Sequence, residues 1–225
     1  IFKHGQNNNL TKDNFIMINS ASEIRSAART ALSGHWAEAA MFTFVYYLAS
    51  WAIGAVSTGL ELIVPGASML VILLVLPMGW GYSVAFLGNR RGAEDPFNVS
   101  HLLDGYKDFS RIFTTILLMQ LYTFLWALLL IVPGIIKGLS YSMTCFVLCD
   151  NPDMKNNEAI ELSMKMMDGH KTALFWLYLT FIGWGILCIF TFGIGYFWLA
   201  PYMQASLAQF YEEVKEDYIT RYALA

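Results

Sequence analysis

The chain has 225 residues, of which 56% are hydrophobic and only 14% are charged, and its mean hydropathy is +0.47. A soluble domain carries about 25% charged residues, so the composition argues against an ordinary soluble protein. The formal net charge of −3 gives no reason to expect nucleic-acid binding. The three cysteines lie in apolar runs, and their odd number argues against a disulfide framework.

The N-terminal part of the sequence is polar up to residue 19, which predicts disorder there. The first 30 residues lack the apolar segment of a cleavable signal peptide. Ser20 or Ser22 can cap a following helix, with Arg25 and Arg29 on one of its faces. Another face is apolar, with Ile24, Ala27, Ala28, Ala31 and Leu32 at helical spacing. This pattern predicts an amphipathic helix lying on a membrane surface.

Six apolar runs follow, and we predict that each forms a transmembrane helix. The run from Ile112 to Val132 has 21 residues, and a helix of that length spans roughly 30 Å, the thickness of the bilayer's hydrocarbon core. The predicted spans are about 36–59, 67–87 with a kink at Pro77, 112–132, 133–150, 172–190, and 196–210 broken by Pro201.

Short corners join these runs in pairs, and the central corner is predicted at Pro133 and Gly134. Pro133 has no amide hydrogen and restricts Val132, while Gly134 permits a reversal. Asp150-Asn151-Pro152 is predicted to end the returning helix and to cap the next segment.

Three segments line up as an internal repeat: Ser33-Gly34-His35-Trp36, Asp104-Gly105-Tyr106-Lys107 and Asp168-Gly169-His170-Lys171. Each closes an amphipathic helix and opens an apolar run. We therefore predict an all-α, polytopic membrane protein with six transmembrane helices in three repeated hairpins, each preceded by an interfacial amphipathic helix. The six helices form a single membrane domain over 20–214, with repeat units at about 20–89, 96–152 and 157–214, and 215–225 is a cytoplasmic tail.

The basic residues predict an orientation. Among the 14 Lys and Arg residues, only Lys137 lies at a short corner. The positive-inside rule therefore places both termini and both long loops in the cytoplasm.

The central sequence resembles a bacterial multi-pass membrane family known as domain of unknown function 975. The residues that carry the resemblance are Val132-Pro133-Gly134-Ile135-Ile136-Lys137, Tyr141-Ser142-Met143, Asp150-Asn151-Pro152, Glu158-Ala159-Ile160 and Gly169-His170-Lys171. The architecture is also distantly similar to the membrane region of some glycerophosphodiester phosphodiesterases, although the chain has no hydrolase domain. The resemblance implies a bacterial cytoplasmic membrane protein and assigns no chemistry.

Two charged side chains at the ends of predicted spans are candidate ligand sites. Lys137 could bind an anionic headgroup or substrate, or simply snorkel from its helix to the interface. Glu38 could hold a proton or a cation, or be satisfied by a neighbouring amphipathic helix. His35 and His170 occupy equivalent repeat positions and are expected to anchor at the interface.

Polar residues inside the spans are the remaining candidates. Gln120 and Gln204 either join helices or line a polar cavity, because an unsatisfied amide in hydrocarbon is costly. Tyr141 and Ser142 are expected to form hydrogen bonds between helices or to line a substrate pathway. Cys145 and Cys149 share a helix face, but packing is a better account of them than a soft-metal site.

No catalytic constellation, metal site or cofactor site is recognisable, and we expect no enzyme activity. The favoured function is a non-enzymatic role in binding lipids, organising the membrane or assisting assembly. The alternative is a small permease or lipid transporter with a polar path between its helices. The expected partners are membrane lipids, and other membrane proteins or a second copy of the chain are open alternatives.

Overall fold

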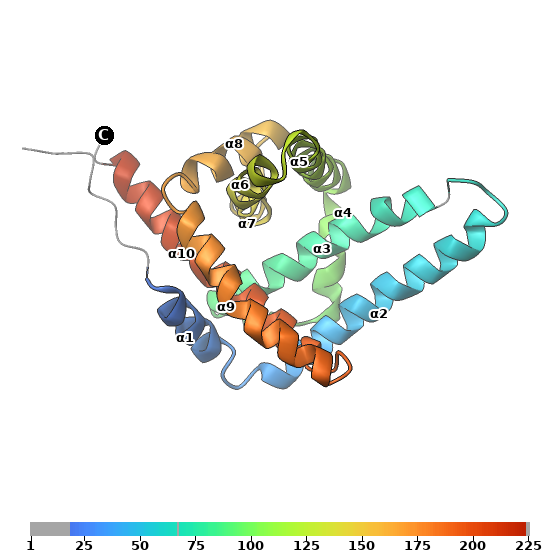
Figure 1. Cartoon of the computed structure of the whole chain (residues 1–225), viewed down its shortest axis with the longest axis horizontal. Coiled ribbons are helices and arrows are strands. Elements are labelled where there is room, and N and C mark those ends of the chain that lie inside the picture. The colour runs from blue at the N-terminus through green and yellow to red at the C-terminus, as the bar shows by residue number, and fades with distance from the viewer. Residues whose placement is uncertain (1–18, 67, 224–225) are drawn as a thin grey trace, which may run out of the picture.

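The computed structural model describes residues 19–66 and 68–223, with only the backbone for residues 70–72 and 223. The predicted disorder of residues 1–19 lies outside this part of the chain, apart from Asn19. All the described elements are helical, which confirms the all-α prediction (Figure 1). They are α1 (Ala21–Ala31), α2 (Trp36–Glu61), α3 (Ser68–Arg90), the 3-10 helix η1 (Val99–Leu103), α4 (Asp104–Lys107), α5 (Phe109–Leu129), α6 (Ile131–Tyr141), α7 (Thr144–Asp150), α8 (Asn156–Met166), α9 (Lys171–Phe190) and α10 (Tyr196–Ala223).

Four described segments are long and apolar enough to cross a membrane: α2, α5, α6 continued by α7 (Ile131–Asp150), and α9. The other two predicted spans fall in α3 and α10. Both are helices, but neither is among these four. Pro77 and Pro201 each lie inside their helix and do not end it.

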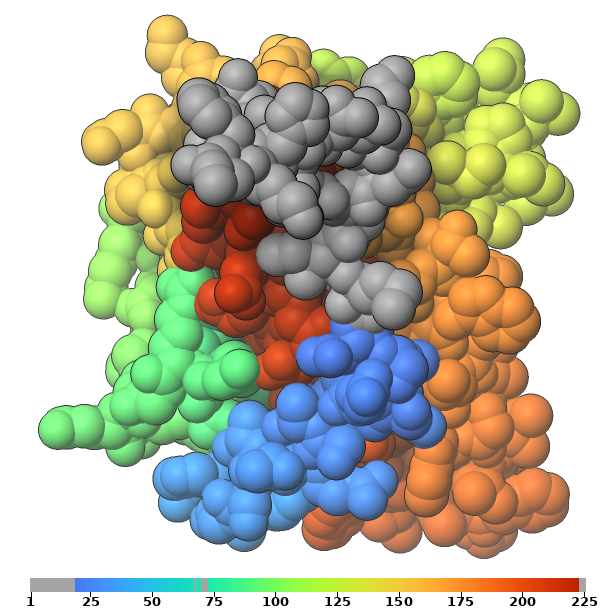
Figure 2. Space-filling model, turned by 90° about the vertical axis from the view of Figure 1, so that its left-hand side faces the viewer, coloured from blue at the N-terminus to red at the C-terminus, as the bar shows by residue number. Residues whose placement is uncertain are grey.

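The predicted amphipathic helix is α1, and Ser20 is its N-cap. The Ser20 side chain accepts a hydrogen bond from the Glu23 amide at 3.4 Å, and the Glu23 carboxylate accepts one from the Ser20 amide at 2.7 Å. The apolar face of α1 packs against α10 and α9, where Ile24, Ala28 and Leu32 are buried. In the view of Figure 2, the outer side of α1 (blue) faces the reader and α10 (red) lies beside it.

Removing the cap should loosen the first turn of α1. We expect Ser20→Ala to destabilise the helix by about 1 kcal/mol and to speed tryptic cleavage after Arg25 and Arg29. Hydrogen bonds from Ser20 lower the pKa of Glu23. The stabilisation is therefore present above the ordinary carboxyl pKa and is lost as the pH falls through the lowered value. Ser22→Ala is the control, and equal cleavage of the two variants would mean that Ser20 is not the cap.

The reversal between α5 and α6 differs from the prediction. It takes place at Leu130, which has φ −158° and ψ 138°, and not at Pro133 and Gly134. Both of these residues lie in the first turn of α6, where a proline needs no amide partner. A Cβ on Gly134 would lie 2.6 Å from the Ala127 Cα. The glycine is therefore needed because α5 and α6 approach closely there, not because the chain bends.

The three predicted repeat segments fall into two kinds of structure. Gly34 and Gly169 have φ values of +89° and +86°, which favour glycine, and each is followed by a histidine that is the N-cap of a long helix. Gly105 instead lies inside α4 and packs on Pro77 of α3. The turns at Gly34 and Gly169 thus have the same backbone geometry, whereas the segment at Gly105 is helical.

Three pairs of consecutive helices, α2–α3, α5–α6 and α9–α10, pack against each other as hairpins. Buried residues gather at one end of these pairs. We call this region the base; it comprises α1, the start of α2, the end of α3, α7, α8, the start of α9 and most of α10. We call residues 60–66, 68–69, 125–136 and 186–196 the tips, where the side chains of Leu62, Ile131 and Phe192 are 90%, 76% and 98% exposed. In Figure 1 the α2–α3 hairpin extends across the picture, whereas α5 and α6 are seen nearly end-on. The hairpins therefore leave the base in different directions.

Candidate functional site

An apolar groove runs between α1, α2, α9 and α10 and has a volume of about 570 Å³. The residues that line it are Arg29, Trp36, Trp184, Leu187, Cys188, Thr191, Gly195, Trp198, Leu199 and Tyr202. Three of them are tryptophans, and Arg29 is the only charged member of the set. The groove reaches from the base, at Arg29, to the tip between α9 and α10, at Thr191 and Gly195.

Arg29 is held at its end of the groove by Tyr202. The guanidinium carbon lies 5.7 Å from the centre of the Tyr202 ring, and Nη2 donates a hydrogen bond to the Tyr202 hydroxyl at 3.4 Å. That hydroxyl donates in turn to the backbone carbonyl of Arg25 at 3.2 Å. Within the described residues, Arg29 forms no ion pair with a carboxylate. The groove therefore has apolar walls and one positive charge, and no carboxylate among its lining residues neutralises that charge.

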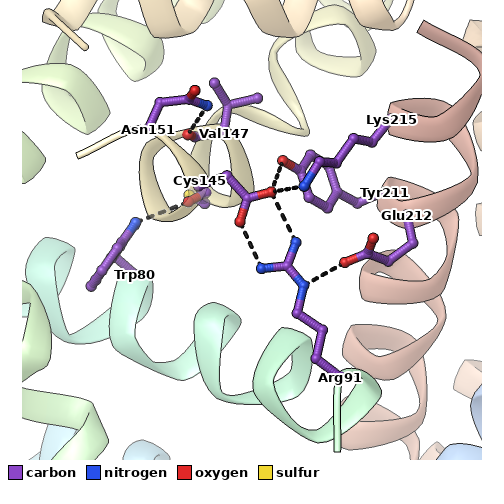
Figure 3. A network of polar contacts seen from close by, with 9 residues as sticks. Trp80, Arg91, Cys145, Val147, Asn151, Tyr211, Glu212 and Lys215 are labelled. Carbon is purple, nitrogen blue, oxygen red and sulfur yellow. Dashed lines mark hydrogen bonds and ion pairs between the residues drawn. The ribbon is translucent and has the colours of Figure 1, made fainter. Parts of the chain in front are cut away.

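A network of polar contacts around Asp150 joins the ends of α3 and α7 to the middle of α10 (Figure 3). Arg91 donates two hydrogen bonds to the Asp150 carboxylate, at 2.7 and 2.8 Å. Lys215 and Tyr211 of α10 donate to the same carboxylate at 2.5 and 2.8 Å, and Arg91 also donates to Glu212 at 2.7 Å. The Asp150 side chain is 11% exposed. Hydrogen bonding to Asp150 raises the pKa of Arg91 above its ordinary value.

The structure confirms that a helix ends at Asp150, and Asn151 is its C-cap. The predicted second role of this motif is wrong, because α8 begins only at Asn156 and is preceded by Lys155. Pro152 is exposed. The motif instead supplies the carboxylate that joins α7 to the end of α3 and to α10.

His170 is buried and does not anchor at an interface, contrary to the prediction. Its Nε2 lies 2.7 Å from Oδ2 of Asp217, a fully buried carboxylate that also pairs with Arg221 at 2.7 Å. The pair connects the start of α9 to α10. Gly169 provides the left-handed turn before His170, and Lys171 is the first, half-buried residue of α9.

The two charged candidates lie in separate places. The Lys137 ammonium lies 5.2 Å from the centre of the Trp126 ring and 4.0 Å from the sulfur of Met164 in α8. Glu38 lies in the first turn of α2 with its side chain 58% exposed, and its carboxylate is 2.7 Å from Nδ1 of His35. Its partner is therefore a neighbour in sequence and not an amphipathic helix.

The polar candidates inside the apolar runs do not form a common path. Gln120 is exposed on α5 and Gln204 is half-buried on α10, and neither makes a hydrogen bond to another described residue. Tyr141 is buried, and Ser142 donates to Leu139 of its own helix turn at 2.7 Å. In the parts of the chain that the structure describes, no hydrogen bond or ion pair links any two of Lys137, Gln120, Tyr141, Ser142, Gln204 and Glu38.

Metal ligands are not clustered in the described ranges. No group of three or more His, Cys, Asp and Glu side chains is placed to hold a metal ion there. Cys145, Cys149 and Cys188 are free thiols.

Comparison with known proteins gives a family. A family model described as "Protein of unknown function (DUF975)" matches residues 17–137 and 128–218. The chain belongs to the DUF975 family. No curated protein and no solved structure gives a significant match. The resemblance of the sequence to this family is thereby confirmed over residues 17–218.

Sequence reasoning missed the groove of this DUF975 protein, although part of its signal was visible. Arg25 and Arg29 were placed together on one face of the amphipathic helix that is α1. What the sequence did not show is that Tyr202, 173 residues further on, contacts Arg29. The partners of Asp150 were likewise missed, because Arg91 and Lys215 are 59 and 65 residues away from it.

Proposed function

We propose that this DUF975 protein is a non-enzymatic integral membrane protein that binds and organises lipids around a packed base. The observation that carries the proposal is the placement of its apolar surface. In the most apolar windows of α2, α5 and α9, only 22%, 17% and 17% of the residues are buried. These helices therefore offer most of their apolar side chains to surroundings other than the protein itself.

Exposed hydrocarbon on this scale is not stable in water, since soluble monomers rarely expose contiguous apolar patches larger than a few hundred Å². Helices satisfy their own backbone hydrogen bonds and can therefore stand in lipid. Because the tips diverge, acyl chains would surround each hairpin separately. The distribution of Lys and Arg supports a base and both termini on the cytoplasmic side of a bacterial membrane, with six crossings in three hairpins.

Thiol labelling in intact cells tests this topology. In a variant without Cys145, Cys149 and Cys188, single cysteines would replace Leu62 and Phe192 at the tips and Asp153 at the base. A membrane-impermeant maleimide should label both tips in intact cells, and should label position 153 only after permeabilisation. Labelling of position 153 before the tips would overturn the orientation, and a protein extracted by alkaline carbonate would overturn membrane integration.

A small permease is the second candidate. α3 and α10 each contain an internal proline, Pro77 and Pro201, which removes one backbone donor from a helix that stays continuous; helices weakened in this way occur at the binding sites of many transporters. In that case Gln120→Leu or Gln204→Leu should abolish flux while leaving lipid binding unchanged. If both variants still bind lipid and their solute flux equals that of the wild type, the permease function is refuted and only the lipid-binding role remains.

A further inference from the structure

We infer that the groove between α1, α2, α9 and α10 binds one anionic phospholipid, with its phosphate at Arg29 and an acyl chain along the tryptophans. The inference rests on the proposed membrane location and goes further by naming a ligand class and a site. It is argued from the size of the groove, its single charge and its direction.

The size and walls of the groove suit an acyl chain. Its volume of about 570 Å³ lies within the usual range of roughly 300–1,000 Å³ for sites that bind small molecules. Trp184, Leu187 and Trp198 are 49%, 56% and 54% exposed, so large apolar side chains in the groove remain available to a ligand. Along α10, the stretch from Gly195 to Tyr202 extends for about 10 Å, which matches a substantial part of an extended hydrocarbon chain.

The charge of the groove selects an anion. A guanidinium carries five N–H donors in a planar fork that fits phosphate oxygens. Arg29 uses one nitrogen for Tyr202 and donates to no other acceptor in the described part of the chain. The Tyr202 hydroxyl is oriented by its own bond to the Arg25 carbonyl, so the guanidinium is positioned before a ligand arrives. One unpaired charge matches the single negative charge of a phosphodiester headgroup.

Other grooves of the base differ from this one. A groove near Arg90 holds no carboxylate, but Arg90 donates a hydrogen bond to Gln209 there, and two more grooves contain carboxylates. The one near Arg91 also contains Glu212 and Glu216. The one near Arg111 contains Asp108, Asp153 and Glu158. In these two grooves Arg91 and Arg111 pair with carboxylates, Glu212 and Asp108, whereas no carboxylate lines the groove at Arg29.

The direction of the groove agrees with a lipid of the cytoplasmic leaflet. Arg29 belongs to α1 in the base, whereas Thr191 and Gly195 lie at the tip between α9 and α10. A headgroup at Arg29 would therefore lie at the base, and its chain would point toward the tip. This is the orientation that a phospholipid has in the leaflet nearest to the base.

Native mass spectrometry with a defined lipid mixture tests the site. The full chain in mild detergent would be mixed with equal amounts of phosphatidylglycerol and phosphatidylcholine that carry the same acyl chains. We expect one phosphatidylglycerol to be retained at least tenfold more often than phosphatidylcholine. Arg29→Gln should abolish this preference, and Cys188→Trp, which fills the groove, should abolish retention of that lipid altogether. Arg25→Gln is the matched control, because Arg25 lies one turn away on α1 and does not line the groove.

The outcomes separate the site from the wider proposal. Retention of both lipids without preference would overturn the anionic site and leave the membrane role in place. Equal loss of the preference in Arg29→Gln and Arg25→Gln would also overturn it, since the effect would then come from the charge of α1 as a whole. Competition by glycerol phosphate without acyl chains would show a phosphate site, not a lipid site. A protein that does not enter membranes in the labelling experiment would instead refute the proposed function.

Discussion

Asp150→Asn should destabilise the base by about 3 kcal/mol, because removing one partner of a buried ion pair costs roughly 3–5 kcal/mol and this network is partly open to solvent. The carboxylate accepts hydrogen bonds from Arg91, Lys215 and Tyr211, and Lys215 and Tyr211 come from α10. A neutral amide cannot balance the charge of Lys215, and Arg91 would keep only Glu212 as a partner. We expect a lower unfolding temperature in detergent and faster proteolysis at the end of α10.

Two further variants make the prediction about Asp150 specific. Asp153→Asn changes an exposed carboxylate three residues away and should leave the unfolding temperature unchanged. Adding Lys215→Met to Asp150→Asn should recover part of the loss, because it removes the unbalanced charge. An Asp150→Asn protein as stable as the wild type would mean that the network does not hold the base together.

Gly105→Ala should be the most damaging conservative change in the first half of the chain. A Cβ at this position would lie 2.1 Å from the backbone oxygen of Pro77, and neither backbone can move without shifting a helix. The contact between α4 and α3 also includes the hydrogen bond from the Tyr106 hydroxyl to the Leu74 carbonyl. Overpacking costs about 1–3 kcal/mol, and we expect the upper end of this range. The measurement is the thermal unfolding of the detergent-solubilised protein.

Gly183→Ala is the matched control for Gly105→Ala. Gly183 also lies inside a helix, but a Cβ there would meet nothing within 4 Å. Its stability should stay within about 0.5 kcal/mol of the wild type. If the two alanine variants unfold at the same temperature, the close approach of α4 to α3 at Pro77 would be refuted.

Local patterns in the sequence predicted much of the fold, because helices leave periodic signals. The capped amphipathic helix at Ala21–Ala31 and the helix end at Asp150 were both visible from spacing and turn residues. The reversal at Leu130 was not visible in the sequence, because an extended leucine has no characteristic local pattern. The nearby Pro133 and Gly134 form a typical turn pattern and led to the wrong position. Four of the six predicted spans meet the length and composition of a membrane helix in the described residues.

The candidate sites were harder to predict because polarity within an apolar run does not show which way a side chain faces. Gln120 was noticed for its polarity, but it is exposed on α5 and makes no hydrogen bond within the described residues. Asp150 was noticed as a helix stop, while its ionic partners were too distant in sequence to be inferred. The groove at Arg29 forms only where four helices meet, so it cannot be predicted from any single segment of the sequence.

The packing of α10 against α1 has a consequence for the order of events during synthesis. Asn19 donates hydrogen bonds to Glu213 across 194 residues, and Tyr211, Lys215 and Asp217 all complete contacts with earlier helices. The chain must therefore be synthesised as far as Asp217 of α10 before the base can close. In the membrane location proposed above, the helix pairs would insert one after another without a common anchor, and a nascent chain stalled before residue 211 would be inserted but not assembled.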